Sequence, residues 1–267
     1  MKKPILIIGG TGFVGSALTK DLIQAGYTVK SIGREVDITK ISSLKPYFHK
    51  QSIVINLVGL SPLRKPSHTT YKAVHVDGVR NIVKLCKQYS ARLIHISALG
   101  VSPHAQTQYL KTKYEAEKII QKEGTLQSTI VRPSVLYDTT HELFTLCTKL
   151  LFLRSFPNIP AKVQPVHRLD LVRLLKEFVK RKPTQQLYEL GGPKEYTLYE
   201  MVRLYFHAKK RLCIPIPLLF AKLGLLGAIL LQKATMDQIK NLTLDSITLQ
   251  KIQQNQIVYE DWLKSLS

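Results

Sequence analysis

The glycine-rich segment 9–15, which reads GGTGFVG, places the strongest constraint on the fold. It directly follows the apolar run Ile5–Ile8, which is typical of a central parallel strand buried on both faces. Apolar residues then recur at helical spacing from Phe13 to Ile23, and Gly26 is expected to end that helix. A strand, a glycine turn and a helix in this order predict the βαβ unit of a Rossmann-type fold.

Each glycine of this segment has a separate expected role. Gly9 allows a tight turn, Gly12 lets the backbone approach a pyrophosphate, and Gly15 lets helix and strand pack closely. The N–H groups at the start of the helix would then face the phosphates. The alternative is that the glycines serve only the turn itself.

Strands and helices continue to alternate along the chain, which predicts an α/β fold with a doubly wound parallel sheet. Further strands are expected at 27–32, 52–58, 92–96 and 128–131, and helices at about 71–88 and 109–121. After residue 133 the pattern loosens, with a helix at 169–180, a strand at 186–190 and a helix at 198–208. We interpret residues 1–267 as a single NAD(P)-binding domain, in which 136–165 and 192–267 form most of a small, mainly helical substrate lobe.

The end of the second strand favours NADP(H) over NAD(H). An acidic residue there would bind the ribose hydroxyls and repel a 2′-phosphate. This chain has Arg34 instead, which can bind a phosphate through two parallel hydrogen bonds, although Glu35 follows directly. Asp37 and Ile38 come soon after, so a full crossover helix is not expected, and the pair could line an adenine pocket.

A tyrosine and a lysine one helical turn apart are the main catalytic candidates. Tyr109 and Lys113 share one face of a helix, and Lys113 could stabilise a phenolate while it also binds a ribose. Ser97 comes at the carboxyl end of the preceding strand and could orient a substrate oxygen. His75 could contact the cofactor, whereas His95 is interpreted as a packed histidine. No histidine has ligand spacing with a carboxylate or a cysteine, so no metal site is predicted.

Composition narrows the class of partner. With 39 Lys and Arg against 18 Asp and Glu, the net charge of +21 favours anionic partners such as nucleotides or anionic lipid surfaces. The basic residues are scattered and no reader motif is present, so nucleic-acid binding is not predicted. A generally basic surface without a partner is the alternative. The three cysteines form no CxxC pair and no signal peptide is recognisable, which indicates a reducing, cytoplasmic setting.

The apolar segment Ile214–Leu231 leaves three interpretations open. It is interrupted by Lys222 and contains two prolines and two glycines. A membrane-spanning helix, an interfacial or lid-like hairpin, and packing against the core are all compatible with this composition.

Several motifs together resemble the short-chain dehydrogenase/reductase superfamily, whose extended and atypical members open with TGxxGxxG. The glycine turn and Tyr109xxxLys113 carry the general resemblance. Six further segments are similar to an atypical branch that includes the NADPH-carrying accessory subunit of respiratory complex I and its bacterial relatives. They are Val54–Gly59, Val74–Asn81, Leu93–Gly100, Ile130–Ser134, Gln164–His167 and Tyr188–Pro193.

This resemblance implies a set of residues at the cofactor: Gly9, Thr11, Gly12, Phe13, Val14, Arg34, Leu57, Val58, Gly59, Lys113 and Pro133. It also implies a site for a poorly soluble, quinone-related ligand under the C-terminal lobe and a membrane-complex partner. The apolar segment Ile214–Leu231 and the net charge of +21 would suit work at a membrane surface, on the inner face of the membrane. The short segment from Arg34 to Asp37 departs from the branch and is more similar to sugar-nucleotide reductases. Asp138 stands where the branch has glycine.

Three functions are therefore compatible with the sequence. The first is an NADPH-dependent oxidoreductase acting on a small or prenylated, quinone-related carbonyl, with Tyr109 as acid, Lys113 as its electrostatic partner and Ser97 as orienting residue. The second is a non-catalytic NADPH-binding assembly or structural protein of a membrane respiratory complex. The third is a sugar-nucleotide reductase or epimerase.

Overall fold

The computed structural model describes residues 3–50, 52–63, 69–124, 126–181, 186–220, 235–250 and 256–266. The chain divides into two compact units, which are described separately. Unit 1 comprises Met1–Leu60, Pro66–Pro133 and Leu169–Glu189, and unit 2 comprises Ser61–Lys65, Ser134–Arg168 and Leu190–Ser267.

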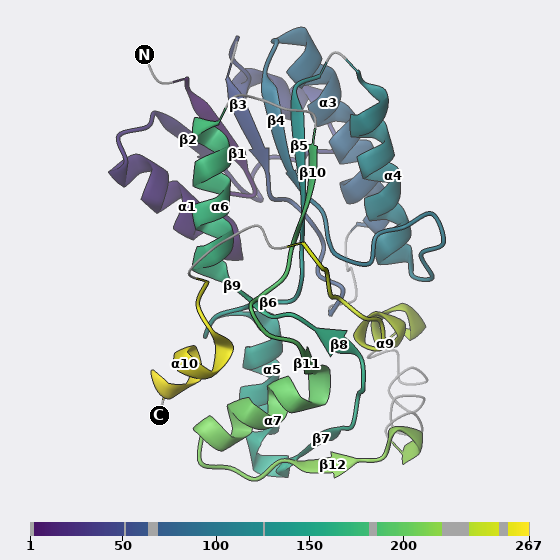
Figure 1. The fold of residues 1–267 in the computed structure, drawn as a ribbon. Coiled ribbons are helices and arrows are strands. Elements are labelled where there is room, and N and C mark those ends of the chain that lie inside the picture. Colours follow the sequence, from purple (N-terminus) through teal and green to yellow (C-terminus); the bar gives the residue numbers. More distant parts are fainter. Residues whose placement is uncertain are drawn as a thin grey trace. The chain divides into compact units, whose positions relative to one another are not determined.

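Unit 1 is built on a six-stranded sheet, and this confirms the predicted Rossmann-type α/β fold (Figure 1). The strand order is β10-β5-β4-β3-β1-β2, and the five strands from β1 to β5 are parallel to their neighbours. The strands are β1 (Ile5–Ile8), β2 (Val29–Ile32), β3 (Ile53–Asn56), β4 (Arg92–Ile96), β5 (Ser128–Pro133) and β10 (Gln186–Leu190). Because β1 lies between β2 and β3, the chain reverses its direction of winding at β1, where such sheets bind ligands.

Helices cover both faces of this sheet. Helices α1 (Phe13–Gln24) and α6 (Arg168–Lys180) lie side by side on one face, joined by an ion pair of 2.8 Å between Asp21 and Lys176 (Figure 1). Helices α3 (Gly78–Gln88) and α4 (Gln108–Lys122) cover the other face. The connection from β2 to β3 contains only the single turn α2 (Ile41–Leu44) and the 3-10 turn η1 (Lys45–Tyr47), in agreement with the expectation that a full crossover helix is missing.

The helix predicted at 71–88 has an irregular first part. Residues Lys72–Asp77 form a π-helical turn, η2, which leads directly into α3. A π turn inserts an extra residue into the helix and is frequent at functional sites. Its buried residues Val74, His75 and Val76 face the interior of unit 1.

Unit 2 contains short strands and helices around an aromatic core. Its strands are β6 (Leu136–Tyr137), β7 (Ser155–Pro157), β8 (Lys162–Val163), β9 (Val166–His167), β11 (Tyr196–Thr197) and β12 (Ile214–Ile216). Its helices are α5 (Glu142–Leu150), η3 (Leu151–Leu153), α7 (Leu198–Ala208), α9 (Met236–Leu242) and α10 (Tyr259–Lys264). The rings of Tyr137, Phe144, Tyr259 and Trp262 pack with centroids 5.0–6.1 Å apart. This aromatic core is separate from the aliphatic core of unit 1.

The apolar segment Ile214–Leu231 begins with strand β12, which pairs in parallel with β7. Residues 221–234 lie outside the described residues, and the three interpretations of this segment apply mainly to them. Among the helices that the structure describes, none combines the length and the hydropathy that a membrane span needs.

Candidate active site

The glycine turn lies at the carboxyl end of β1 and is tightly folded. Gly9 has a positive φ of 86°, a conformation that glycine adopts without cost. The N–H groups of Gly9 and Gly10 both donate to the carbonyl oxygen of Ile32 at the end of β2. At Gly15 a Cβ atom would lie 2.2 Å from the carbonyl oxygen of Gly9, so close packing of α1 on the turn requires glycine there.

The start of α1 is open toward a ligand. At Gly12 a Cβ atom would meet one neighbour within 4 Å among the described residues, the carbonyl oxygen of Gly9 at 3.1 Å. Gly12 is the N-cap of α1, provides no side-chain hydrogen bond, and no acidic residue occupies the first turn. Backbone N–H groups with this exposure suit a phosphate anion. The turn therefore fits the pyrophosphate of a dinucleotide, as the sequence predicts.

The end of β2 carries two opposite charges with different partners. Glu35 bends back and its carboxylate accepts the N–H of Gly33 at 2.7 Å, an interaction that lowers the pKa of Glu35. Arg34 is exposed and makes no hydrogen bond or ion pair with any residue that the structure describes. The guanidinium is therefore available to an anionic ligand, whereas the neighbouring carboxylate is already engaged with the backbone.

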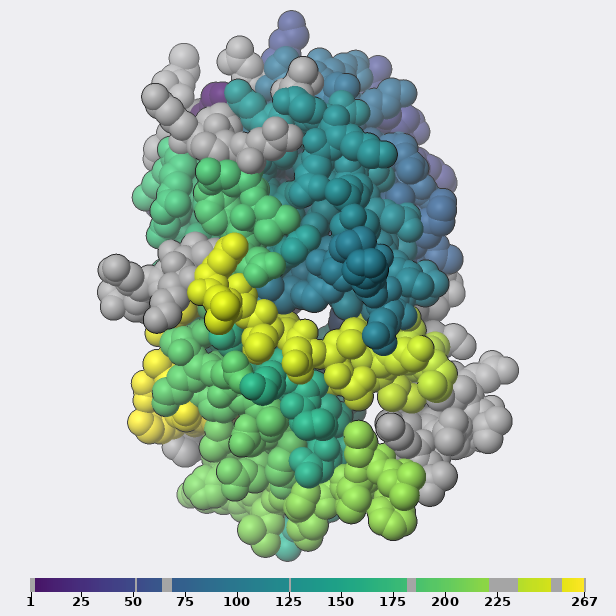
Figure 2. Space-filling view, turned by 45° about the vertical axis from the view of Figure 1, so that its right-hand side comes forward, coloured from purple at the N-terminus to yellow at the C-terminus, as the bar shows by residue number. Residues whose placement is uncertain are grey.

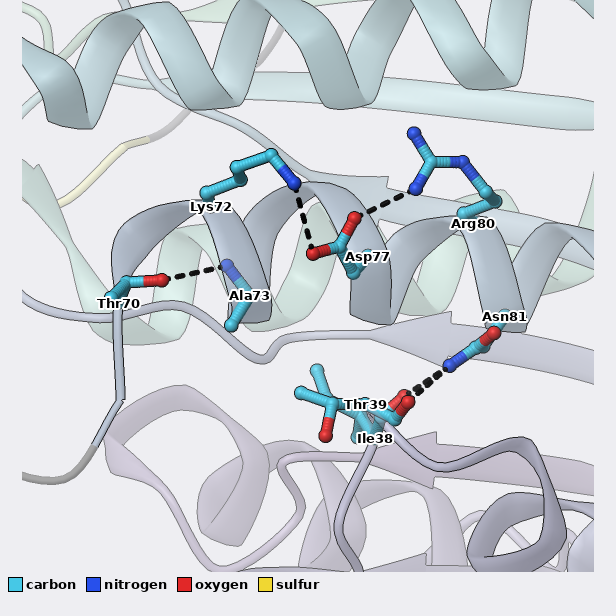
Figure 3. A network of polar contacts seen from close by, with 8 residues as sticks. All are labelled: Ile38, Thr39, Thr70, Lys72, Ala73, Asp77, Arg80 and Asn81. Carbon is cyan, nitrogen blue, oxygen red and sulfur yellow. Dashed lines mark hydrogen bonds and ion pairs between the residues drawn. The ribbon is translucent and has the colours of Figure 1, made fainter.

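Asp37 and Ile38 are held within the chain. The carboxylate of Asp37 accepts the N–H and the hydroxyl of Thr39, and the side chain of Ile38 is buried. The amide of Asn81 on α3 donates to the carbonyl oxygens of Ile38 and Thr39, at 3.1 and 2.8 Å, and so ties this segment to the helix (Figure 3). In the same view Asp77 binds Lys72 and Arg80 along η2 and α3. The segment is thus well fixed, and its contact with adenine stays a prediction.

The loop after β3 is shaped by a buried asparagine to which the sequence analysis gave no role. The side-chain oxygen of Asn56 accepts the N–H of Val58 at 3.1 Å, and its amide donates to Nδ1 of His95 at 3.0 Å. A Cβ atom on Gly9 would lie 3.1 Å from the backbone carbon of Leu57, so this loop touches the glycine turn. The signal for this role in the sequence was a polar residue at the end of a buried apolar strand.

His75 holds the next residues of the same loop. Its Nε2 accepts the N–H of Leu60 and its Nδ1 donates to the hydroxyl of Thr112, both at 3.0 Å. Burial and the positive charge of Lys113 lower the pKa of His75 to about 2, so the ring is neutral at pH 7. Both ring nitrogens are engaged within the chain. Any effect of His75 on a bound cofactor would therefore come from its positioning of this loop, which includes Gly59.

Lys113 lies at the centre of this edge of the sheet. Its ammonium group is buried and donates to the carbonyl oxygen of Ile96, the last residue of β4, at 2.9 Å. A Cβ atom on Gly59 would lie 3.2 Å from Nζ of Lys113, so the lysine also reaches the loop after β3. Burial lowers the pKa of Lys113 to about 8, partly offset by Glu117.

Tyr109 packs one turn before Lys113 within an aromatic cluster. Its ring lies 5.6 Å from that of His75 and 5.8 Å from that of Tyr71. Burial, together with Tyr71, raises the pKa of Tyr109. Tyr109 is therefore a protonated phenol at pH 7 and a weaker acid than a free tyrosine, and Lys113 does not offset the effect of burial. As a proton donor it is matched to a strongly basic acceptor, such as the oxyanion that forms when a carbonyl accepts a hydride.

Ser97 carries a buried hydroxyl immediately after β4. Its N–H donates to the carbonyl oxygen of Val131, but its Oγ has no hydrogen-bond partner among the described residues. Nε2 of His95 is also buried without one. Buried polar atoms are usually paired, so this pair of atoms suggests that a bound molecule completes the site.

An ion-pair network fixes α4 against the sheet. Glu117, one turn after Lys113, is buried and accepts two hydrogen bonds from Arg132 of β5, at 2.6 and 2.9 Å. Arg132 also binds Glu189 at 3.3 Å. Pro133, which ends β5, is buried and accepts the N–H of Leu99. Glu117 and Arg132 were not predicted from the sequence, because a charged residue on a helix and another on a strand look like ordinary solvated side chains.

The structure brings the predicted catalytic residues and most predicted cofactor residues to the carboxyl edge of one parallel sheet. This arrangement defines the chain as a dinucleotide-binding protein of the Rossmann type. Residues 5–141, just over half of the 267 residues, match the NAD dependent epimerase/dehydratase family. The chain belongs to this family, which corresponds to the extended short-chain dehydrogenase/reductases, and the predicted resemblance is confirmed.

Two curated relatives illustrate what the chain is similar to. The chain is 24% identical over 230 residues to the mitochondrial 40 kDa subunit of NADH-ubiquinone oxidoreductase from Neurospora crassa, covering 77% of this chain and 60% of that protein. It is 26% identical over 173 residues to UDP-glucose 4-epimerase from Vibrio cholerae, covering 51% and 53%. The chain thus spans 60% or less of the length of these two relatives.

Solved structures with the same fold contain nicotinamide cofactors. The dTDP-4-dehydrorhamnose reductase of Bacillus anthracis in complex with NADP has a TM-score of 0.69 at 19% identity, covering 81% of this chain and 85% of that one. The UDP-glucose 4-epimerase of Thermus thermophilus in complex with NAD has a TM-score of 0.65 at 18% identity, covering 80% and 86%. At this identity the likeness shows the fold.

Proposed function

We propose that the protein is an NADPH-dependent oxidoreductase that reduces the carbonyl of a small or prenylated, quinone-related compound. The observation that carries the proposal is the combination, at one sheet edge, of a protonated Tyr109, a buried Lys113 and the unpaired hydroxyl of Ser97. The glycine turn and Arg34 supply a place for the dinucleotide.

The chain's own residues would handle the proton. The dinucleotide supplies a hydride when bound. The phenol of Tyr109 donates the proton that the carbonyl oxygen needs to become an alcohol, and the hydroxyl of Ser97 orients that oxygen. The ammonium of Lys113, held at the carbonyl oxygen of Ile96, would bind a ribose of the dinucleotide. Above a pH of about 8 Lys113 loses its proton, so turnover is expected to fall there.

A second candidate is a non-catalytic NADPH-binding protein of a membrane respiratory complex. It is supported by the relatives described as NADH-ubiquinone oxidoreductase or NADH dehydrogenase subunits, which match 75–79% of this chain. In that case we expect stabilisation by NADPH without its consumption, and a peripheral position on the cytoplasmic face of a membrane. A sugar-nucleotide reductase or epimerase is the third candidate, supported by the epimerase relative.

Cofactor preference tests the nucleotide half of the proposal. We expect NADPH to bind more tightly than NADH, and Arg34→Glu to lower NADPH affinity by at least tenfold, because a carboxylate repels the 2′-phosphate. Titration followed by nicotinamide fluorescence and melting temperature measures both affinities. Lys84→Glu, an equally large charge change on an exposed residue of α3 without an ion pair among the described residues, is the control. If Arg34→Glu binds NADPH like the wild type, Arg34 has no role at the phosphate.

Ser97→Ala separates function from folding. Because a buried hydroxyl without a partner costs about 1–3 kcal/mol, its removal should leave the free energy of unfolding unchanged or higher. Turnover should fall, since the substrate oxygen loses a hydrogen bond. Thr112→Val is the matched comparison: the hydroxyl of Thr112 is bonded to His75 and to the carbonyl of Gln108, so this change should destabilise the protein. Denaturant unfolding and NADPH consumption measure the two effects. Loss of stability in Ser97→Ala would contradict this assignment.

A further inference from the structure

One surface of unit 2 exposes large apolar side chains next to basic ones. It is formed where η3 and β7 meet the segment from the end of α7 through β12, and we call it the β7–β12 surface. The N–H of Ile214 donates to the carbonyl oxygen of Arg154 at 2.8 Å, which brings the two segments together (Figure 1).

The apolar part of this surface is well exposed. Phe152 is 78% and Leu212 is 71% exposed, and both lie beside the β7–β12 pair. The exposed apolar residues of these segments are Phe152, Leu153, Leu212 and Ile214. Single exposed apolar residues are common, but contiguous ones mark an interaction surface.

The charged part of this surface is entirely basic. Arg154, Lys210 and Arg211 are exposed and interleave with the apolar residues. The two stretches of chain that meet here, 143–169 and 201–236, contain no Asp or Glu. The acidic residues of unit 2 lie on other elements, for example Glu195, Glu260 and Asp261. Figure 2 shows the residues just after α7, in lime green, on the surface of unit 2.

We propose that the β7–β12 surface binds the interface of an anionic lipid bilayer. Aromatic and aliphatic side chains would insert at the level of the acyl boundary, while lysine and arginine contact the headgroup charges. Lysine is depleted from protein interfaces although arginine is enriched there, whereas an anionic membrane attracts both. Charge complementarity therefore favours a lipid surface over a second copy of this basic chain.

Two basic residues allow a test that does not damage the fold. Arg154 and Lys210 have positive φ values of 49° and 53°, a conformation that favours glycine. Arg154→Gly with Lys210→Gly thus removes two charges from the surface and relieves unfavourable backbone. Lys20→Ala with Lys84→Ala removes the same charge from exposed helix positions of unit 1 and is the matched control.

The experiment is co-sedimentation of the full chain with vesicles. We expect binding to phosphatidylcholine vesicles that contain phosphatidylglycerol, little binding to phosphatidylcholine alone, and release at high salt. The glycine double variant should bind roughly thirtyfold more weakly, since each basic residue contributes about 1 kcal/mol at an anionic surface. The control variant should bind almost like the wild type.

A second pair of variants tests the apolar part. Phe152→Ser and Leu212→Ser remove exposed side chains, so folding should be preserved and vesicle binding should fall. The proposal is overturned if the control variant loses as much vesicle binding as the glycine double variant, or if the wild type binds neither kind of vesicle. If the variants change the molar mass of the protein in light scattering but leave vesicle binding unchanged, the surface serves self-association instead. The test needs no cofactor, so its outcome is independent of the proposed reaction.

Discussion

Tyr109→Phe is expected to lower the turnover of NADPH with a carbonyl substrate by roughly 10²- to 10⁴-fold, the usual contribution of a positioned proton donor. The substitution removes one oxygen and keeps the ring that packs against His75 and Tyr71. Because the glycine turn and Arg34 are untouched, NADPH affinity should remain within about a factor of two or three of the wild type, which is the ordinary scatter of a change that makes no contact with the ligand.

The measurement is NADPH oxidation with a panel of soluble naphthoquinones and aromatic aldehydes, alongside a fluorescence titration of NADPH. Lys111→Ala is the control, because Lys111 is an exposed residue of the same helix. If Tyr109→Phe retains wild-type turnover, Tyr109 does not supply the proton. If the wild type binds NADPH but oxidises none of it with any of these compounds, the non-catalytic candidate gains support.

The pH dependence gives an independent check on Lys113. The pKa of Lys113 is lowered to about 8 by burial, so the ammonium form is present below that pH and is lost above it. A reductase that needs this cation should therefore be active near neutral pH and lose activity as the pH rises. The pKa of Tyr109 is raised, so the phenol stays protonated throughout this range.

Local periodicity was sufficient to predict the elements that hold the site. The apolar runs 5–8 and 92–96 and the helical spacing after Phe13 coincide with β1, β4 and α1, and the chain turns at Gly26 with a positive φ of 74°. Each of these elements is regular, and its pattern of apolar and polar side chains is clear enough to be distinguished from a chance pattern. The glycine turn was informative because its neighbours on both sides were recognisable.

The contacts that fix the site were not visible in the sequence. The bond between His75 and the N–H of Leu60 depends on a π turn, and periodicity does not distinguish such a turn from an α-helix. The bend of Glu35 onto Gly33, which leaves Arg34 available, depends on side-chain conformation. The pairing of β7 with β12 joins residues about sixty positions apart through strands of three residues, too short to show alternation.

Substitutions in the glycine turn give the second large expected effect, because alanine at Gly15 and alanine at Gly12 should impair the protein in different ways. At Gly15 an added Cβ would lie 2.2 Å from the carbonyl oxygen of Gly9 and 2.6 Å from Cα of Gly10, both backbone atoms. Gly15→Ala must therefore distort the turn, at a cost of about 1–3 kcal/mol in the free energy of unfolding. NADPH binding should be lost with it.

Gly12→Ala should instead keep the fold and still lose the cofactor. Its Cβ would meet one atom within 4 Å among the described residues, the carbonyl oxygen of Gly9 at 3.1 Å, a tight contact that a small backbone shift can relieve. The same methyl group would stand at the start of α1, where the pyrophosphate is expected to approach. We expect a melting temperature without ligand that is much less reduced than in Gly15→Ala, and NADPH affinity at least tenfold lower.

Gly124→Ala completes the series, since a Cβ there meets no atom of the described part of the chain within 4 Å and should change neither property. Thermal unfolding with and without NADPH separates the three variants: stability is lost at Gly15, the stabilisation by ligand is lost at Gly12, and both are kept at Gly124. If Gly12→Ala binds NADPH like the wild type, the phosphates do not lie against this helix. The glycines would then serve the turn alone, and the cofactor site would have to be sought elsewhere on the sheet edge.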